Sequence, residues 1–412
     1  MDARTGFVIY ENAQHQPMYP ASITKIMTAL VVLENVDDLS EEVVFSEYAV
    51  MSLPYYASRL NVMAGETMTV YEALYGLMLP SGNDVANALA EHVSGSISGF
   101  VEHMNHRAFQ LGAVNTQFVN ACGLPGDNQH TTAYDMALIM REAIQHPVFN
   151  EVMSAPTFVL PPMESFPDFP EGREIWNTNL LIQNGDFHNP WVLGGKTGFT
   201  NAAQHTLVSH ARRGDYDLII SVLYAPRRAT FTDTTALLEH VFEMPIQTLF
   251  DIRDHSWQKP VMQTIEGEAT EVGLINIEGA NSLLLPLPPG TPAIRHEIYI
   301  PAHLTAPVRS GDVVGYKSFY AGDELIAEVE LISKNTVLPR MAAPPRPRQE
   351  VSITPPITSD NSHNLVFFAL LPVVTFILLA ALYVLMQRHR RIMLRRRRRM
   401  SRIRYARYGG LE

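Results

Sequence analysis

Between residues 20 and 30 the chain reads Pro20-Ala21-Ser22-Ile23-Thr24-Lys25-Ile26-Met27-Thr28-Ala29-Leu30, a turn that leads into an apolar helix. Proline suits the approach to a helix start. Ser22 is expected at the N-terminus of this helix, where free backbone N–H groups and the helix dipole favour a developing oxyanion. Lys25 follows three residues later, so its side chain shares a face with Ser22. The spacing predicts a serine nucleophile with a lysine base beside it.

Lysine is scarce in the first 258 residues, where Lys25 and Lys196 are the two that occur. Arginine carries nearly all the other positive charge of this region, so general solubility does not explain these two amines. Burial lowers the pKa of a lysine far enough for it to act as a base, which arginine does not do. The pattern therefore assigns both lysines to chemistry.

A second motif, Pro80-Ser81-Gly82-Asn83-Asp84, lies between two apolar helical segments. Serine and asparagine are also good helix caps, so the motif alone is compatible with a purely structural role. The functional interpretation puts the Ser81 hydroxyl beside the lysine amine as a proton relay. The Asn83 amide would then bind a substrate amide.

The third motif is Gly194-Gly195-Lys196-Thr197-Gly198-Phe199-Thr200. Glycines in a strand allow a substrate backbone to approach closely. Lys196 and Thr197 are candidates to hold a carboxylate, and the Phe199 N–H could join the Ser22 N–H in an oxyanion hole. A glycine-flanked hairpin end is the structural alternative for this motif.

The periodicity of apolar residues changes near residue 250. Before it, helical periods such as residues 70–78 alternate with short strands such as residues 217–224. After it, short alternating segments at 270–277, 294–300, 313–320 and 325–331 predict a small all-β domain. We expect an α+β catalytic domain over residues 1–248, in which helices flank an antiparallel sheet, and a β-rich domain over 249–340.

The last 72 residues have three different compositions. Residues 341–363 are rich in proline and read as a stalk. Residues 364–386 contain no charge and are long enough to cross a membrane as a helix. Residues 387–412 hold eleven arginines and one acidic residue, which predicts a cytoplasmic tail and an extracytoplasmic body. Because the whole chain still has a net charge of -11, the body is acidic, which argues against nucleic acid as a partner.

An outward-facing body requires an N-terminal signal, and Met1-Asp2-Ala3-Arg4-Thr5-Gly6 has no apolar core for one. Residues 6–10 already read as a strand that leaves a turn. We therefore expect a signal peptide and a first strand to precede the given start. A tail-anchored protein with a cytosolic body is the alternative, but it would place the arginines on the far side of the membrane, against the charge rule.

Together the three motifs resemble the penicillin-recognising serine enzymes. Flanking matches point to the serine-type D-Ala-D-Ala carboxypeptidases, the low-molecular-mass penicillin-binding proteins of peptidase family S11. These matches are Asp2–Gly6, Pro20–Thr28, Leu79–Asp84, Gly123-Leu124, His130–Asp135, Leu304–Val308 and Gly311–Gly315. One departure is Ala203-Gln204, where the family usually has Ala-Gly.

The resemblance implies a specific reaction. Ser22 would form an acyl-enzyme, with Lys25 as base, Ser81 as relay and Lys196 as the group that binds the terminal carboxylate. The last D-alanine of the peptidoglycan stem peptide would be released, and β-lactams would act as covalent inhibitors. We expect no cofactor and no metal, and the single cysteine argues against a multi-cysteine metal site.

Four alternatives share parts of this pattern. A class A β-lactamase needs a Glu-x-x-x-Asn loop, and no such spacing occurs between Ser81 and Lys196. A DD-endopeptidase would use the same site, and a catalytically silent wall-binding scaffold would be expected to lack a motif residue. A metalloenzyme has only the helical pair His103 and His106 in its favour.

Cys122, the single cysteine, is interpreted as a packing residue.

Overall fold

The computed structural model describes residues 1–251, 261–264, 269–274, 282–301, 303–333 and 336–338. Residues 1–340 form one compact unit, and the second unit, residues 341–412, lies outside the described residues. The predicted stalk, membrane span and arginine-rich tail all fall in this second unit. Within the described ranges, no helix combines the length and the apolar character that crossing a membrane requires.

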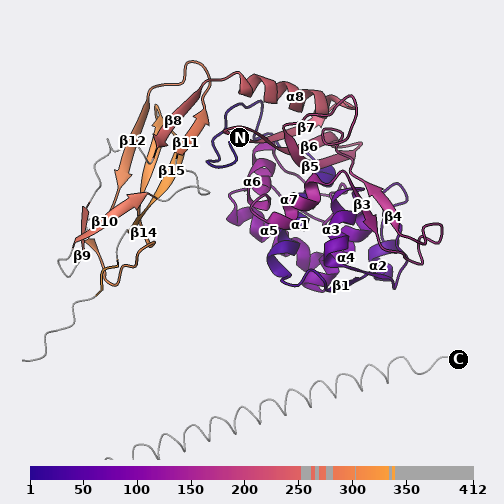
Figure 1. Cartoon of the computed structure of the whole chain (residues 1–412). Coiled ribbons are helices and arrows are strands. Elements are labelled where there is room, and N and C mark those ends of the chain that lie inside the picture. Colours follow the sequence, from indigo (N-terminus) through magenta and orange to yellow (C-terminus); the bar gives the residue numbers. More distant parts are fainter. Residues whose placement is uncertain (252–260, 265–268, 275–281, 302, 334–335, 339–412) are drawn as a thin grey trace, which may run out of the picture. The chain divides into compact units, whose positions relative to one another are not determined.

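A three-stranded antiparallel sheet organises the N-terminal domain (Figure 1). Its strands are β5 (Val192–Thr200), β6 (Gln204–Arg213) and β7 (Tyr216–Ala225), in that spatial order. The register pairs Lys196 of β5 with Val208 of β6. The chain start adds to the outer side of β7, where Asp2 bridges to Leu218. The Lys196 motif therefore occupies the edge strand at the opposite side.

Figure 1 shows α8 on one side of this sheet and α6 and α7 on the other. The helices and short strands of the domain are η1 (Ala21–Ile23), α1 (Thr24–Asn35), β1 (Glu42–Val44), α2 (Glu47–Met51), β2 (Thr67–Thr69), α3 (Val70–Met78), α4 (Asn83–Ser94), α5 (Ile97–Gln110), α6 (Ala133–Ala143), α7 (Pro147–Ser154), β3 (Thr157–Leu160), β4 (Arg173–Trp176) and α8 (Ala229–Phe242). Strand β1 pairs with β2, and β3 pairs with β4.

Helix α1 lies in the core of the domain. All of its residues from Thr24 to Val32 are buried, and it contacts α3, α4, α5 and α6. A helix that is apolar on every side is stable only when other elements surround it. This burial also encloses Lys25, which stands in the first turn of α1 and has no exposed surface.

The C-terminal part of the first unit is all-β, as the sequence predicts. Strand β8 (Ile246–Asp251) pairs with β11 (Ser282–Pro286). A second sheet has the order β12-β14-β15-β10-β9-β13. Its strands are β9 (Val261–Thr264), β10 (Ala269–Leu274), β12 (Ile294–Tyr299), β13 (His303–Leu304), β14 (Val313–Ala321) and β15 (Glu324–Ser333). The inward side chains of β14 and β15, such as Phe319 and Val329, supply the apolar core.

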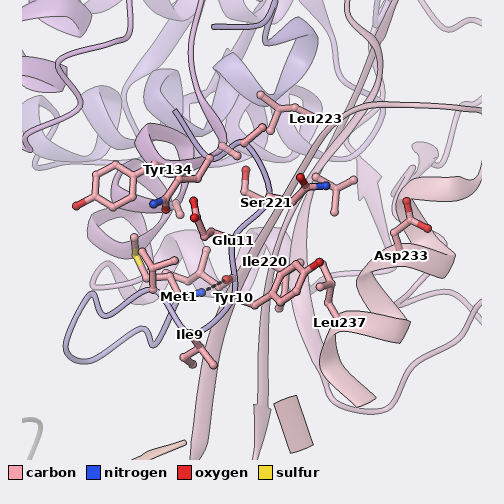
Figure 2. A pocket seen from close by; sticks show the side chains of 18 of the residues that line it. Met1, Ile9, Tyr10, Glu11, Tyr134, Ile220, Ser221, Leu223, Asp233 and Leu237 are labelled. Carbon is pink, nitrogen blue, oxygen red and sulfur yellow. Dashed lines mark hydrogen bonds between the residues drawn. The ribbon is translucent and has the colours of Figure 1, made fainter. Parts of the chain in front are cut away.

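Residues 6–10 do not form the strand that their sequence predicts. Phe7 and Ile9 are buried, but residues 8–11 and β7 line a common cavity of about 830 Å³. A strand needs a hydrogen-bonded neighbour, and this arrangement does not supply one. Figure 2 shows Tyr10 with Ile220 and Leu237 among the side chains that line the cavity. Since no residue of the three motifs lines it, the cavity is separate from the candidate site.

Candidate active site

Ser22 stands in a tight turn at the start of the buried helix α1. Ala21, the residue before it, has a φ of 52°, in the left-handed region. That conformation costs an L-residue about 1–2 kcal/mol, so the surroundings must hold it. Thr206 of β6 contributes by donating its hydroxyl to the Pro20 carbonyl at 3.0 Å. The turn is thus fixed against the sheet, with Ser22 half-buried at the helix start.

The Lys25 amine is the centre of the hydrogen-bond network. Its Nζ lies 3.1 Å from Ser22 Oγ, 2.6 Å from Asn83 Oδ1 and 2.8 Å from the Cys122 carbonyl oxygen. Burial lowers the pKa of Lys25 from 10.5 to about 8, against an opposing attraction from Cys122 and Asp84. A substantial fraction of this amine is therefore neutral near pH 8, in the form that can accept the Ser22 proton.

The second motif lies at the start of α4 and contacts the Lys25 amine through Asn83. Asn83 is the first residue of α4, and its side-chain oxygen accepts a hydrogen bond from Lys25. Ser81 has a φ of 67°, and its buried Oγ makes no hydrogen bond to any described residue. A buried hydroxyl without a partner is costly, which favours a role that is fulfilled with substrate present. The sequence predicts that the Ser81 hydroxyl lies beside the Lys25 amine, and the structure shows no hydrogen bond between the two groups.

Asp84, next to Asn83, acts on the backbone rather than on substrate. Its carboxylate is fully buried and accepts hydrogen bonds from the backbone N–H groups of Leu60 at 2.9 Å and Asn61 at 2.8 Å. Hydrogen bonds to a charged acceptor are stronger than neutral ones. Asp84 thereby attaches the preceding loop to the Ser81 motif.

Lys196 enters the site from β5. Its side chain is almost fully buried, and its Nζ donates to the Thr197 carbonyl at 2.9 Å. Burial, and after it the charge of Lys25, holds the pKa of Lys196 well below its ordinary value. The Thr197 hydroxyl lies 2.5 Å from that of Thr178. Consecutive residues of the edge strand thus supply an amine and a hydroxyl group, which are groups that suit a carboxylate.

Gly198 allows β5 to lie directly against the Ser22 turn. A β-carbon at this position would stand 2.7 Å from the Ser22 backbone nitrogen and 2.5 Å from Thr206 Oγ. Phe199 follows with 53% of its surface exposed, and its ring tilts over His205 of β6 at 4.5 Å. The first and third motifs therefore meet, although Ser22 and Gly198 are 176 positions apart in the sequence.

A loop that the sequence analysis did not assign to the site completes the surroundings of Lys25. The Asn120 side-chain oxygen accepts hydrogen bonds from the backbone N–H groups of Cys122, Gly123 and Leu124. Gly123 has a φ of 86°, and a β-carbon there would collide with the Ala21 carbonyl. The loop is thus held so that the Cys122 carbonyl faces the lysine. Burial raises the pKa of the Cys122 thiol, in keeping with its interpretation as a packing residue.

The structure brings together Ser22, Lys25 and Asn83 by direct hydrogen bonds, and it places Gly198 against Ser22. The contributions that sequence reasoning missed are the carboxylate of Asp84, the amide of Asn120 and the Cys122 carbonyl. Asp84 and the dipeptide Gly123-Leu124 lie in segments that match the family, and this match was the one indication in the sequence that they belong near the site. The Cys122 carbonyl, by contrast, could not be predicted, because every residue has a backbone carbonyl whatever its type.

Known proteins match this chain over both parts of the first unit. A family model described as D-alanyl-D-alanine carboxypeptidase matches residues 1–227, and a model of the penicillin-binding protein 5 C-terminal domain matches residues 291–338. D-alanyl-D-alanine carboxypeptidase DacF of Bacillus subtilis is 30% identical over 346 residues, which cover 80% of this chain and 82% of the relative. DacB2 of Mycobacterium tuberculosis is 36% identical over 54% of this chain and 72% of its own length.

The solved structure of penicillin-binding protein 5 from Haemophilus influenzae has the same architecture. It aligns with a TM-score of 0.64 and 25% identity, over 82% of this chain and 96% of that one. The agreement therefore includes the catalytic domain and the β domain. The family model covers more than half of the chain and contains all three motifs. The chain therefore belongs to the D-alanyl-D-alanine carboxypeptidase family of serine peptidases.

Proposed function

We propose that this chain removes the terminal D-alanine from peptidoglycan stem pentapeptides through an acyl-enzyme on Ser22. Family membership supports the reaction class. One observation carries the mechanism: the buried Lys25 Nζ lies 3.1 Å from Ser22 Oγ, and the pKa of this amine is lowered to about 8. A serine hydroxyl becomes a useful nucleophile only when a neighbouring group takes its proton.

In the acylation step, neutral Lys25 takes the Ser22 proton while Oγ attacks the carbonyl carbon of the penultimate D-alanine. The negative charge that develops on the carbonyl oxygen is received by the N–H groups of Ser22 and Phe199. The proton then passes from Lys25 through the Ser81 hydroxyl to the leaving nitrogen. The C–N bond breaks, free D-alanine departs, and an ester remains on Ser22.

Substrate binding uses the other residues of the two later motifs. The Lys196 ammonium and the Thr197 hydroxyl hold the terminal carboxylate, and Gly198 lets the strand that carries them lie against the Ser22 turn. The Asn83 amide binds a substrate amide. A bound carboxylate favours the protonated form of Lys196, so binding opposes the lowering of its pKa by burial.

Deacylation reverses the proton path. Water attacks the ester carbonyl, its proton moves to Lys25, and Ser22 recovers its hydroxyl proton as the shortened peptide leaves. β-Lactams acylate the same serine, but their leaving group stays tethered to the acyl-enzyme. Because no Glu-x-x-x-Asn loop occurs between Ser81 and Lys196, we expect the penicilloyl ester to persist.

Release of D-alanine from a soluble pentapeptide tests this function. The wild-type chain should release one equivalent of D-alanine per peptide, while Ser22→Ala should release none and retain the fold. Ser40→Ala, which changes an exposed serine outside the site, is the matched control and should retain full activity. Release by Ser22→Ala at the wild-type rate would contradict the assignment of the nucleophile.

We also propose that residues 364–386 anchor the protein in the cell membrane as a single helix, with the body outside and residues 387–412 in the cytoplasm. Support comes from the uncharged run of 23 residues and the arginines that follow it. The proline-rich stalk of residues 341–363 would hold the body, with its domains at 1–248 and 249–340, away from the bilayer. The full chain should sediment with membranes, and a chain ended at residue 340 should not. Recovery of both in the soluble fraction would contradict the anchor.

A further inference from the structure

Residues 53–61, here called the tyrosine loop, carry two aromatic side chains in solvent. Tyr55 is 94% exposed and Tyr56 is 68% exposed. Their rings contact each other edge to face, with centroids 5.6 Å apart. Single exposed apolar side chains are ordinary, whereas adjacent large ones with no covering element are typical of binding surfaces.

The tyrosine loop is held in one shape by its own hydrogen bonds. The Arg59 guanidinium donates to the carbonyls of Leu53 at 2.5 Å and Pro54 at 3.1 Å. The Ala57 N–H closes a turn on the same Pro54 carbonyl at 3.0 Å. The two tyrosines are therefore presented on a fixed backbone, which reduces the entropy lost when a ligand binds.

The same loop is joined directly to the second catalytic motif. The Asn83 N–H donates to the Ser58 carbonyl at 2.9 Å, and the Ser58 hydroxyl donates to the Pro80 carbonyl at 2.9 Å. Asp84 binds the far end of the loop through Leu60 and Asn61. Tyr55 precedes Ser58 by three residues, so its Cα lies within about 11 Å of that of Ser58.

The tyrosine loop also borders the part of the site where the scissile bond is proposed to lie. The terminal carboxylate is held at Lys196, on β5, and the scissile bond lies at Ser22. The Lys25 amine hydrogen-bonds both Ser22 and Asn83, so the Ser81 motif borders the nucleophile. We place the rest of the substrate, including the sugar that carries the stem peptide, along this border, next to the Ser81 motif and the tyrosine loop that is bonded to it.

The chemistry of the loop suits an uncharged sugar. No residue from Tyr48 to Ser58 is charged, and the Arg59 guanidinium is turned to backbone carbonyls. A pyranose ring has a face of C–H groups that packs on an aromatic ring, while its hydroxyls remain available to phenol groups and water. An acidic peptide or lipid headgroup would instead require a free cation at this position.

We infer that Tyr55 and Tyr56 form a saccharide subsite, which binds the glycan that carries the stem peptide during hydrolysis. This inference rests on the proposed function, because it assigns a further part of the same substrate. Trp176 of β4 serves as a comparison residue, which tests whether the sugar binds at the tyrosine loop or near Thr178. It is 59% exposed and lies two residues before Thr178, which contacts the Lys196 side of the site.

The experiment compares a sugar-free pentapeptide with the N-acetylglucosaminyl–N-acetylmuramoyl pentapeptide, using the full chain. Tyr55→Ala combined with Tyr56→Ala should raise KM for the disaccharide substrate about tenfold. Its kcat, its kinetics on the sugar-free peptide and its acylation by benzylpenicillin should stay unchanged. Phe109→Ala, which removes a 72% exposed ring on α5, is the matched control and should change nothing.

Three results would overturn the subsite. These are an equal rise of KM on both substrates, no rise on either, and a rise for the disaccharide substrate in Trp176→Ala but not in the double variant. A wild-type chain that is acylated by penicillin yet releases D-alanine from neither substrate would overturn the proposed function first, and this inference with it.

Discussion

Gly198 lies so close to Ser22 that a β-carbon on it would stand 2.7 Å from the Ser22 backbone nitrogen. The strand proposed to bind the substrate carboxylate and the N–H proposed to receive the oxyanion are therefore in contact. This contact links the first and third motifs of the sequence. It also explains why the position must be glycine on steric grounds alone.

Gly198→Ala should displace either β5 or the Ser22 turn. Loss of one oxyanion donor lowers acylation by about 100-fold or more, so we expect a reduction of that order in the rate of acylation by benzylpenicillin. Stopped-flow acylation combined with a thermal melt separates this effect from unfolding. A folded Gly198→Ala protein that reacts at the wild-type rate would refute the proposed contact.

The pKa of Lys25 predicts how acylation depends on pH. Burial lowers this pKa to about 8, and only the neutral amine accepts a proton, so the rate should rise with pH up to about 8 and level off above it. Lys25→Arg keeps a cation at the position but cannot be deprotonated, and should lose about 1,000-fold in rate. A pH-independent wild-type rate between pH 6 and pH 9 (from about two units below this pKa to about one unit above it) would be inconsistent with Lys25 as base.

Lys196 should act mainly on substrate affinity. Because burial and the charge of Lys25 lower its pKa, raising the pH should neutralise it and increase KM for the pentapeptide. Lys196→Met should increase KM about tenfold to 100-fold through loss of a charge-assisted hydrogen bond. The pentapeptide with a C-terminal amide is the control, since it lacks the carboxylate. If KM for the amide rises equally, Lys196 does not bind the carboxylate.

Asn120 is expected to support Lys25 through the backbone. Asn120→Ala removes the acceptor of three N–H groups and should lower the free energy of unfolding by about 2–3 kcal/mol. It should also slow acylation, because the Cys122 carbonyl is no longer held toward Lys25. Asn35→Ala is the matched control, since it removes a hydrogen bond to the Val31 carbonyl at the exposed end of α1, the helix that carries Lys25. Denaturant unfolding and acylation rates measured on both variants decide between these effects.

Local spacing was enough to predict the pairing of Ser22 with Lys25, because three residues along a helix return to the same face. The alternating patterns after residue 250 likewise predicted the β-rich region, with strand ends close to those observed at 294–299 and 313–321. Both predictions rest on periodicities that a short segment carries by itself.

Other parts of the site depend on long-range packing. The acceptor role of Asn83 toward Lys25 requires the start of α4 to meet α1, and spacing does not show which atom of the amide faces the amine. Asp84 and Asn120 act by accepting hydrogen bonds from backbone N–H groups of loops, and loops have no periodic pattern from which such contacts could be predicted. The strand expected at 6–10 was wrong because a strand depends on a partner, which the alternation of side chains does not reveal.

The most direct test of the central claim is the intact mass of the protein after incubation with benzylpenicillin, with Ser22→Ala beside it. We predict a persistent gain of one penicilloyl group on the wild type, located on the peptide that contains Ser22, and no gain on the variant. Rapid hydrolysis of penicillin without an adduct would indicate a β-lactamase. Neither adduct nor hydrolysis from a folded protein would contradict Ser22 as an activated nucleophile.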